Sequence, residues 1–197
     1  MPADARDPTE ARIFVVDDQE PNVRLLERLL HHAGYTNVVS TTEPEEVATL
    51  YLEQPPDLIV LDLMMPKMDG FAVMQDLAKR IPPGTYLPIL VLTADSSPEA
   101  RRRALSMGAK DFLTKPFDHD EALLRIRNLL ETRMFHLELQ EQNARLEERV
   151  RERTQELQRM VDLLQRTADQ RRQMLARVAE LHLMAAADPT EAAEVTT

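Results

Sequence analysis

The sequence predicts an α/β protein in which helices cover both faces of a five-stranded parallel sheet and the last helix continues into a long coiled coil. One observation is that five short apolar runs alternate with helical patterns, at 13–16, 37–39, 58–61, 89–92 and 111–113. The other is the distribution of residues that interrupt helices. All four glycines and twelve of the thirteen prolines lie at or before Pro116, and residues 117–188 contain neither. The chain therefore divides into a first part that contains glycine and proline and an uninterrupted second part, residues 117–188, that contains neither.

The apolar runs are typical of strands that are covered on both faces, as in a parallel sheet. Helical patterns between them lie at 21–34, 45–53, 71–80 and 98–107. A proline stands in the first turn of three of these helices, and Thr42 and Ser97 are candidate N-caps. The alternating order predicts a doubly wound sheet, in which ligands bind beyond the carboxyl ends of the strands.

Composition narrows the classes of function. The 24 Lys and Arg residues face 34 Asp and Glu residues, which gives a net charge of −10 and argues against nucleic-acid and anionic-membrane partners. The absence of cysteine excludes disulfides, thiolate metal sites and thiol nucleophiles. No apolar run is long enough to span a bilayer, and the first ten residues lack the apolar stretch of a signal peptide. We therefore expect a cytoplasmic protein.

Polar residues collect where the predicted strands end. The first strand ends in Asp17 and Asp18, the third in Asp62, the fourth in Thr93 and the fifth in Thr114-Lys115-Pro116. Crowded carboxylates repel one another, and a hard cation such as Mg²⁺ relieves that repulsion. Asp62 is then a candidate nucleophile toward phosphorus, with the metal and Lys115 offsetting the phosphoryl charge. Each aspartate alone could be a turn or cap residue, but their joint occurrence at strand ends favours a site.

Four segments resemble the receiver domain of two-component response regulators: Val15–Asp18, Leu61–Gly70, Leu92–Ala94 and Lys115-Pro116. The likeness covers residues 11–132. It implies a flavodoxin-like fold in which Asp62 accepts a phosphoryl group from a phosphohistidine of a sensor histidine kinase or phosphotransfer protein. It also implies Mg²⁺ bound directly by Asp18, Asp62 and the backbone carbonyl of Met64, and by Asp17 through water. Thr93 and Lys115 are expected to contact the phosphoryl group, and the Lys115-Pro116 peptide is expected to be cis.

The resemblance further implies a switch that pairs Thr93 with Phe112, the aromatic residue three positions before Lys115. Phosphorylation is expected to draw Thr93 toward the phosphate and to open room for Phe112 to turn inward. The family often has tyrosine at this position, and Phe112 lacks the hydroxyl that a tyrosine would use for a hydrogen bond. The alternative is that Phe112 is simply a core aromatic residue of the fifth strand.

The uninterrupted second part carries a heptad pattern. With Leu146 at position d, apolar residues fall at a and d, with Leu139 at the front: Leu139, Leu146, Val150, Leu157, Met160, Leu164, Met174, Val178 and Leu181. Polar residues interrupt it at a (Asn143, Arg171) and at d (Arg153, Thr167). A single asparagine at a favours two strands, so we expect a parallel homodimer. A further apolar row at e (Val161, Ala168, Leu175) could indicate a larger bundle, a back-folded helix or an absent partner. The alternative is a single exposed helix.

We therefore expect a disordered tail at 1–10, a receiver domain at 11–132, a coiled-coil dimerisation and output helix at 133–187, and a disordered tail at 188–197. The expected function is a response regulator that relays phosphorylation of Asp62 through the coiled coil to an unidentified downstream protein. Catalysis is limited to Mg²⁺-dependent self-phosphorylation from small donors and autodephosphorylation.

One alternative is the sensory front of a larger cyclic-dinucleotide phosphodiesterase or cyclase, because residues 148–157 resemble segments that precede such catalytic domains. A haloacid-type phosphatase is excluded, because Asp62 is followed by Leu63-Met64 and not by the second aspartate of an Asp-x-Asp motif.

Overall fold

The structure, a computed structural model, describes residues 7–187. The expected tail at 188–197 and residues 1–6 of the expected N-terminal tail lie outside the described residues. Within the remainder of that tail, Pro8–Glu10 form a 3-10 turn, and the carbonyl of Thr9 accepts a hydrogen bond from Thr36 N–H. The chain forms two compact units, Met1–Glu141 and Gln142–Thr197, which are described separately.

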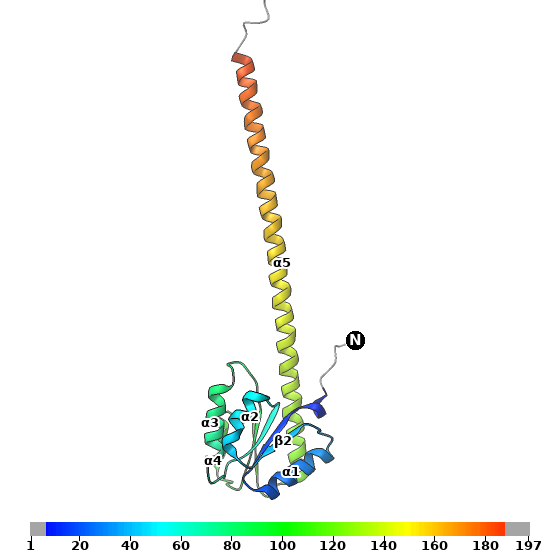
Figure 1. The fold of residues 1–197 in the computed structure, drawn as a ribbon, viewed down its shortest axis with the longest axis vertical. Helices are drawn as coiled ribbons and strands as arrows, with labels where there is room; N and C mark the ends of the chain where they lie inside the picture. The colour runs from blue at the N-terminus through cyan, green and yellow to red at the C-terminus, as the bar shows by residue number, and fades with distance from the viewer. Residues whose placement is uncertain (1–6, 188–197) are drawn as a thin grey trace, which may run out of the picture. The chain divides into compact units, whose positions relative to one another are not determined.

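The first unit is built on a five-stranded parallel sheet (Figure 1). Its strands are β1 (Ile13–Val16), β2 (Val38–Thr41), β3 (Leu58–Asp62), β4 (Ile89–Thr93) and β5 (Asp111–Thr114). The spatial order is β2-β1-β3-β4-β5, and every neighbouring pair is parallel. All residues of β1, β3 and β4 are buried, which explains why these strands are continuous apolar runs in the sequence. The predicted fold class is confirmed.

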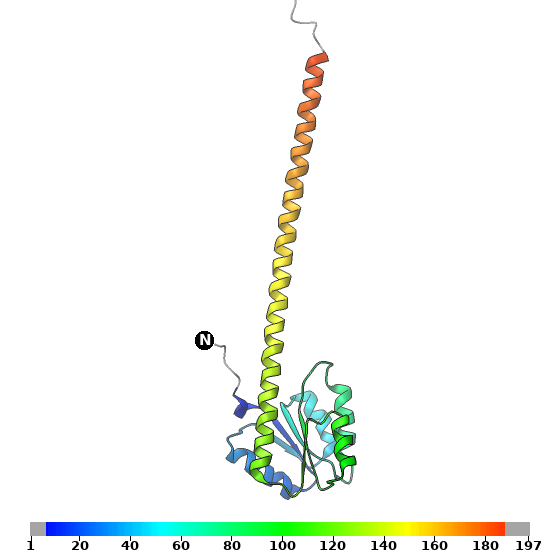
Figure 2. The ribbon, with the colours of Figure 1, turned by 180° about the vertical axis from the view of Figure 1, so that it is seen from behind.

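Helices cover both faces of this sheet (Figures 1 and 2). They are α1 (Glu20–His32), α2 (Val47–Glu53), α3 (Gly70–Arg80), α4 (Pro98–Ser106) and α5 (His119–Ala187), with a 3-10 turn η2 at Pro44–Glu46. Successive side chains of a strand point to opposite faces of the sheet, so each strand contributes residues to two hydrophobic cores. Ile59 and Leu61 of β3 join the core under α2, α3 and α4, whereas Leu58 and Val60 join the core under α1 and α5.

Of the two predicted N-caps, the structure confirms Ser97 and not Thr42. The Ser97 side chain accepts a hydrogen bond from Ala100 N–H at the start of α4, and Asp118 accepts one from Glu121 N–H in the first turn of α5. The expected Thr42 cap is wrong. The segment at 44–53 begins with the 3-10 turn η2, and Thr41 is the residue whose hydroxyl accepts the N–H of Glu43.

The first unit continues to Glu141, past the expected receiver boundary at residue 132. The added turns of α5 contact the loops that precede β3 and β4. Arg133 is 9% exposed, donates to the carbonyl of Tyr86 at 2.5 Å and pairs with Asp57 at 3.4 Å. His136 stacks on the Tyr86 ring with centroids 4.2 Å apart. These long-range contacts, and not a change in the helical pattern, set the boundary.

The second unit is helical from residue 142 to residue 187. Its heptad residues are exposed in the single chain, from 45% at Val178 to 70% at Met174. No helix of residues 7–187 has an apolar segment long enough to cross a membrane.

Gly70 tests the packing of α3 against the end of β3. Its N–H donates to the carbonyl of Leu63, and a Cβ here would lie 2.4 Å from the carbonyl oxygen of Asp62. We expect Gly70→Ala to lower the free energy of unfolding by about 2 kcal/mol, because the clash with backbone exceeds the gain in helix propensity of about 1 kcal/mol. Urea unfolding measures this. Ala78→Ser on the exposed side of α3 is the control and should change stability by less than about 0.5 kcal/mol; equal effects would contradict the packing argument.

Candidate functional site

The carboxyl ends of four strands bring the predicted polar residues to one edge of the sheet. Asp17 directly follows β1, Asp62 ends β3, Thr93 ends β4 and Lys115 directly follows β5. Because these strands are parallel neighbours, their ends lie side by side. One carboxylate oxygen from each of Asp17, Asp18 and Asp62 lies within 4.8 Å of the others.

Asp17 is 1% exposed and is held by donors from three elements. Its carboxylate accepts the N–H of Gln19 at 3.0 Å and both oxygens accept from the Asn22 side-chain amide, at 3.0 and 3.1 Å. Lys115 Nζ lies 2.6 Å from the same carboxylate. Asp17 is therefore fixed in orientation and fully partnered.

Asp62 shares the same ammonium group. Its carboxylate is 2.9 Å from Lys115 Nζ and accepts the N–H of Met64 at 3.3 Å, and the residue is 3% exposed. Burial alone would lower the pKa of Lys115, but hydrogen bonds and charge from Asp17 and Asp62 outweigh it and raise that pKa above its ordinary value. Lys115 thus stays charged between two buried carboxylates.

Asp18 differs from the other two aspartates. Its Oδ1 is buried and has no hydrogen-bond partner within residues 7–187. Asp18 also lines a cavity of about 240 Å³ together with residues of the loops after β2 and β3, and the Lys67–Glu43 ion pair at 2.6 Å joins these loops. An orphaned carboxylate oxygen beside two other carboxylates fits a hard cation with oxygen ligands, such as Mg²⁺.

Thr93 and Lys115 are linked through the backbone. Thr93 is fully buried, its carbonyl accepts the N–H of Lys115 at 2.7 Å, and its hydroxyl accepts the N–H of Asp95 at 3.1 Å. Hydrogen bonds with the backbone and side chain of Ser97 hold the pKa of Asp95 below its usual value. The Lys115-Pro116 peptide is cis.

Phe112 lies inside the core, 8% exposed, and its partner in the β4–β5 ladder is Val91. A buried position is expected both of a switch residue and of a static core residue. The switch role of Phe112 therefore stays a prediction. The metal role of the Met64 carbonyl also stays a prediction.

Sequence reasoning missed Asn22 and the Lys67–Glu43 pair. Asn22 follows Pro21 in the first turn of α1, and a turn residue near the predicted strand end was the available signal. The Lys67–Glu43 pair joins residues far apart in the chain, and nothing in the local sequence indicates it.

Comparisons with known proteins show the family of this chain. A family profile for the response regulator receiver domain matches residues 13–127. Over 119 residues the chain is 41% identical to the probable transcriptional regulator ycf27 of Porphyridium aerugineum, covering 60% of this chain and 48% of that protein. It is 40% identical over 134 residues to the response regulator PleD of Caulobacter vibrioides, covering 68% of this chain and 29% of that protein.

Solved structures give the same result. The chemotaxis protein CheY4 of Vibrio cholerae superposes with a TM-score of 0.57 at 28% identity, over 61% of this chain and 98% of that chain. A receiver domain of a Francisella response regulator gives the same score and identity over 62% of this chain. The chain spans about half the length of the ycf27 relative. Since the profile covers more than half of the chain, the protein belongs to the response regulator receiver family.

Proposed function

We propose that this chain is a phosphoacceptor of a two-component system, with Asp62 as the residue that is phosphorylated. The observation that carries the proposal is the arrangement around Asp62. Lys115 neutralises one side of its carboxylate. Asp18 belongs to the same acidic cluster, lines a cavity, and has a buried Oδ1 without a hydrogen-bond partner among residues 7–187. Buried carboxylates arranged in this way suit the uptake of a phosphoryl group and a divalent cation.

The donor that fits is a phosphohistidine of a sensor histidine kinase or phosphotransfer protein. An oxygen of Asp62 attacks the phosphorus; the new P–O bond forms while the P–N bond to the donor imidazole breaks, and its electron pair stays on that nitrogen. A carboxylate needs no general base for this step. Small phosphodonors would be used through the same attack.

Asp18, Asp62 and the backbone carbonyl of Met64 would hold Mg²⁺ directly, with Asp17 acting through water. When bound, Mg²⁺ supplies positive charge to the phosphoryl oxygens. Lys115 leaves its pairing with Asp62 to contact the transferred group, and the Thr93 hydroxyl donates to one of its oxygens. Movement of Thr93 toward the phosphoryl group would open room for Phe112 to repack, which gives the switch.

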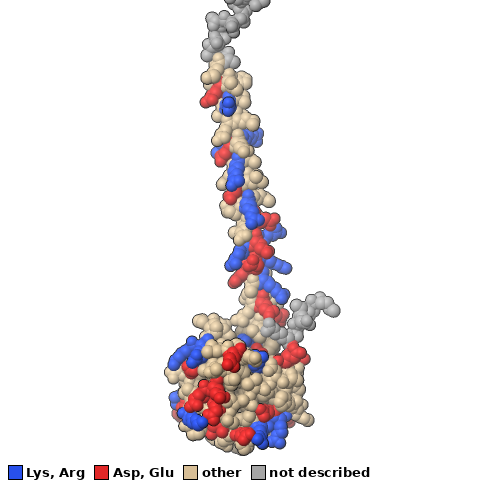
Figure 3. All heavy atoms as spheres, viewed as in Figure 1, with Lys and Arg blue, Asp and Glu red and all other residues tan. Residues whose placement is uncertain are grey.

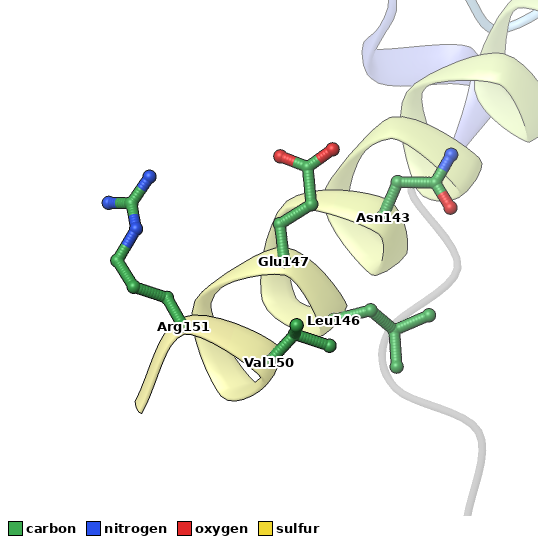
Figure 4. A pocket seen from close by; sticks show the side chains of 5 residues that line it. All are labelled: Asn143, Leu146, Glu147, Val150 and Arg151. Carbon is green, nitrogen blue, oxygen red and sulfur yellow. The ribbon is translucent and has the colours of Figure 1, made fainter. Parts of the chain in front are cut away.

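The output is proposed to run through a parallel coiled-coil dimer of residues 133–187. An open pocket of about 460 Å³ on the second unit is lined by Asn143, Leu146, Glu147, Val150 and Arg151. Figure 4 shows that these side chains all come from one helix. Leu146 and Val150 point to one side of the helix and are 56% and 65% exposed. A helix this long and polar is not stable alone, so a second helix packed on this seam supplies the missing burial.

Two arrangements of the receiver pair with different energies would link Asp62 to this seam, because a switch acts only through such a difference. The downstream protein and the cytoplasmic location stay predictions. A second candidate is that the chain is the sensory front of a cyclic-dinucleotide phosphodiesterase or cyclase. This candidate is favoured by the match to PleD, because the chain covers only 29% of PleD and the rest of that protein lies outside the match.

The metal site can be tested by stability. We expect saturating Mg²⁺, at about a hundred times its Kd, to raise the free energy of unfolding of the wild type by about 2.7 kcal/mol. Asp18→Asn should lose this gain, and without Mg²⁺ it should be more stable than the wild type by about 1 kcal/mol, because one like charge is gone. Urea unfolding with Mg²⁺ or EDTA measures both. Glu53→Gln, at the exposed end of α2, is the control and should keep the Mg²⁺ gain; full retention of the gain by Asp18→Asn would place the ion elsewhere.

The phosphoacceptor can be identified by intact mass after incubation with acetyl phosphate and Mg²⁺. The wild type should gain one phosphoryl group, and Asp62→Ala should gain none, because the acyl phosphate has no other attachment. Asp76→Ala, an acid paired with Arg80 on the surface of α3, should behave as the wild type. A phosphoryl group on Asp62→Ala would refute the assignment.

The parallel dimer can be tested with single thiols, because the chain has no cysteine. In a parallel seam Asn143 at position a faces its own counterpart on the second helix. The two Cα atoms then lie within the separation of about 7 Å that a disulfide allows. Asn143→Cys should therefore form a covalent pair on mild oxidation, of twice the 22.6 kDa chain mass. Glu148→Cys, at the outward f position, is the matched control; cross-linking of the two variants to the same extent would argue against a parallel seam.

A further inference from the structure

The helix of the second unit has two zones with different apolar patterns. In the proximal zone, residues 143–156, position e holds Glu147 and Thr154. In the distal zone, residues 157–181, position e holds the apolar Val161, Ala168 and Leu175. Figure 3 shows charged atoms along the whole helix, more densely in its proximal part and more sparsely toward its distal end. An apolar stripe limited to a and d suits two strands, whereas a stripe widened by e is typical of a helix in a larger bundle.

Polar residues inside the distal stripe add a second constraint. Thr167 at d and Arg171 at a interrupt it within one turn of each other. In a parallel pair each residue faces its own counterpart, so two Arg171 guanidinium groups would meet in the seam as like charges. The parallel arrangement thus satisfies Asn143 in the proximal zone but places equal charges together in the distal zone.

An antiparallel neighbour places the Thr167 hydroxyl beside the Arg171 guanidinium group, because position a then faces position d, so the two Arg171 side chains of a parallel pair gain a polar partner in the same layer. One register matches every layer of the distal zone: Leu157 with Leu181, Met160 with Val178, Leu164 with Met174, and Thr167 with Arg171. Apolar residues face apolar residues, and the two polar residues face each other. A shift of one heptad in either direction places Arg171 against Met174 or Met160. The pairing is self-complementary, so each layer occurs twice about a two-fold axis.

The flank of this register at position e also matches. Val161 lies beside Leu175 of the second copy, and the small Ala168 lies near its own counterpart, which allows the helices to approach closely. Exposure of 45% at Val161 and 62% at Leu175 in the single chain gives this contact apolar area to bury.

We propose that the distal zone is a self-association surface, through which two parallel dimers join in antiparallel register as a four-helix bundle. The occupant of the wide stripe is a second copy of this chain. The inference rests on the parallel dimer of the proposed function and extends it to a tetramer, an arrangement with two-fold axes that are common among closed assemblies. Phosphorylation of Asp62 is not required for it.

Light scattering coupled to size-exclusion chromatography of the full chain measures the assembly. The wild type should have four times the 22.6 kDa chain mass, and the double variant Val161→Glu, Leu175→Glu should have twice that mass, because charges at e block the contact between dimers. Thr154→Glu, at e of the proximal zone, should leave the tetramer intact. Circular dichroism checks that each variant keeps its helix. A double variant that remains tetrameric overturns the proposal.

Orientation is tested by mixing two single-thiol variants, Leu164→Cys and Met174→Cys, under denaturing conditions, followed by refolding and oxidation. In a parallel pair these positions lie about 15 Å apart along the axis, too far for a disulfide. In the antiparallel register they share a layer, so mass spectrometry should find the mixed disulfide. If the mixed disulfide is absent and the wild-type mass is that of two chains, the tetramer is overturned. The Asn143→Cys cross-link would then still support the parallel dimer. A wild-type mass of one chain overturns both.

Discussion

The receiver unit depends on one interaction, the contact of the Lys115 ammonium group with the carboxylates of Asp17 and Asp62, at 2.6 and 2.9 Å. Both aspartates are almost fully buried, and a buried charge without a partner is strongly destabilising. The three residues come from the ends of β1, β3 and β5. A parallel sheet is the arrangement that delivers them to one edge, and the tight start of α3 at Gly70 holds the end of β3 in place.

The three aspartates of the acidic cluster differ in how many hydrogen-bond donors they have. Asp17 has donors from Gln19, Asn22 and Lys115, whereas Asp18 keeps one buried oxygen without a partner. A cluster in which every oxygen was paired would have no reason to take up a cation. The uneven distribution of donors therefore carries more functional information than the presence of three aspartates, because acidic residues at strand ends also serve as turns and caps.

The strands and strand-end residues could be predicted, because buried parallel strands are continuous apolar runs and their ends follow directly in the sequence. Asn22 could not, since its contact with Asp17 depends on the entry angle of α1. The Thr42 cap was wrong because a 3-10 turn precedes α2 and begins after Glu43, which makes no side-chain cap hydrogen bond. The extension of the first unit to Glu141 rests on Arg133 reaching Tyr86, a contact between distant segments that no local pattern encodes.

The same physical rule applies to both units: apolar residues supply the energy of association, and polar residues among them select the arrangement. In the sheet, the observed order of strands places Lys115 between two carboxylates. In the helix, leucine and methionine fit many registers, but Asn143 favours a parallel pair and the closely spaced Thr167 and Arg171 favour an antiparallel one. Since the two preferences occupy different zones, a single helix can satisfy both only by meeting more than one partner copy.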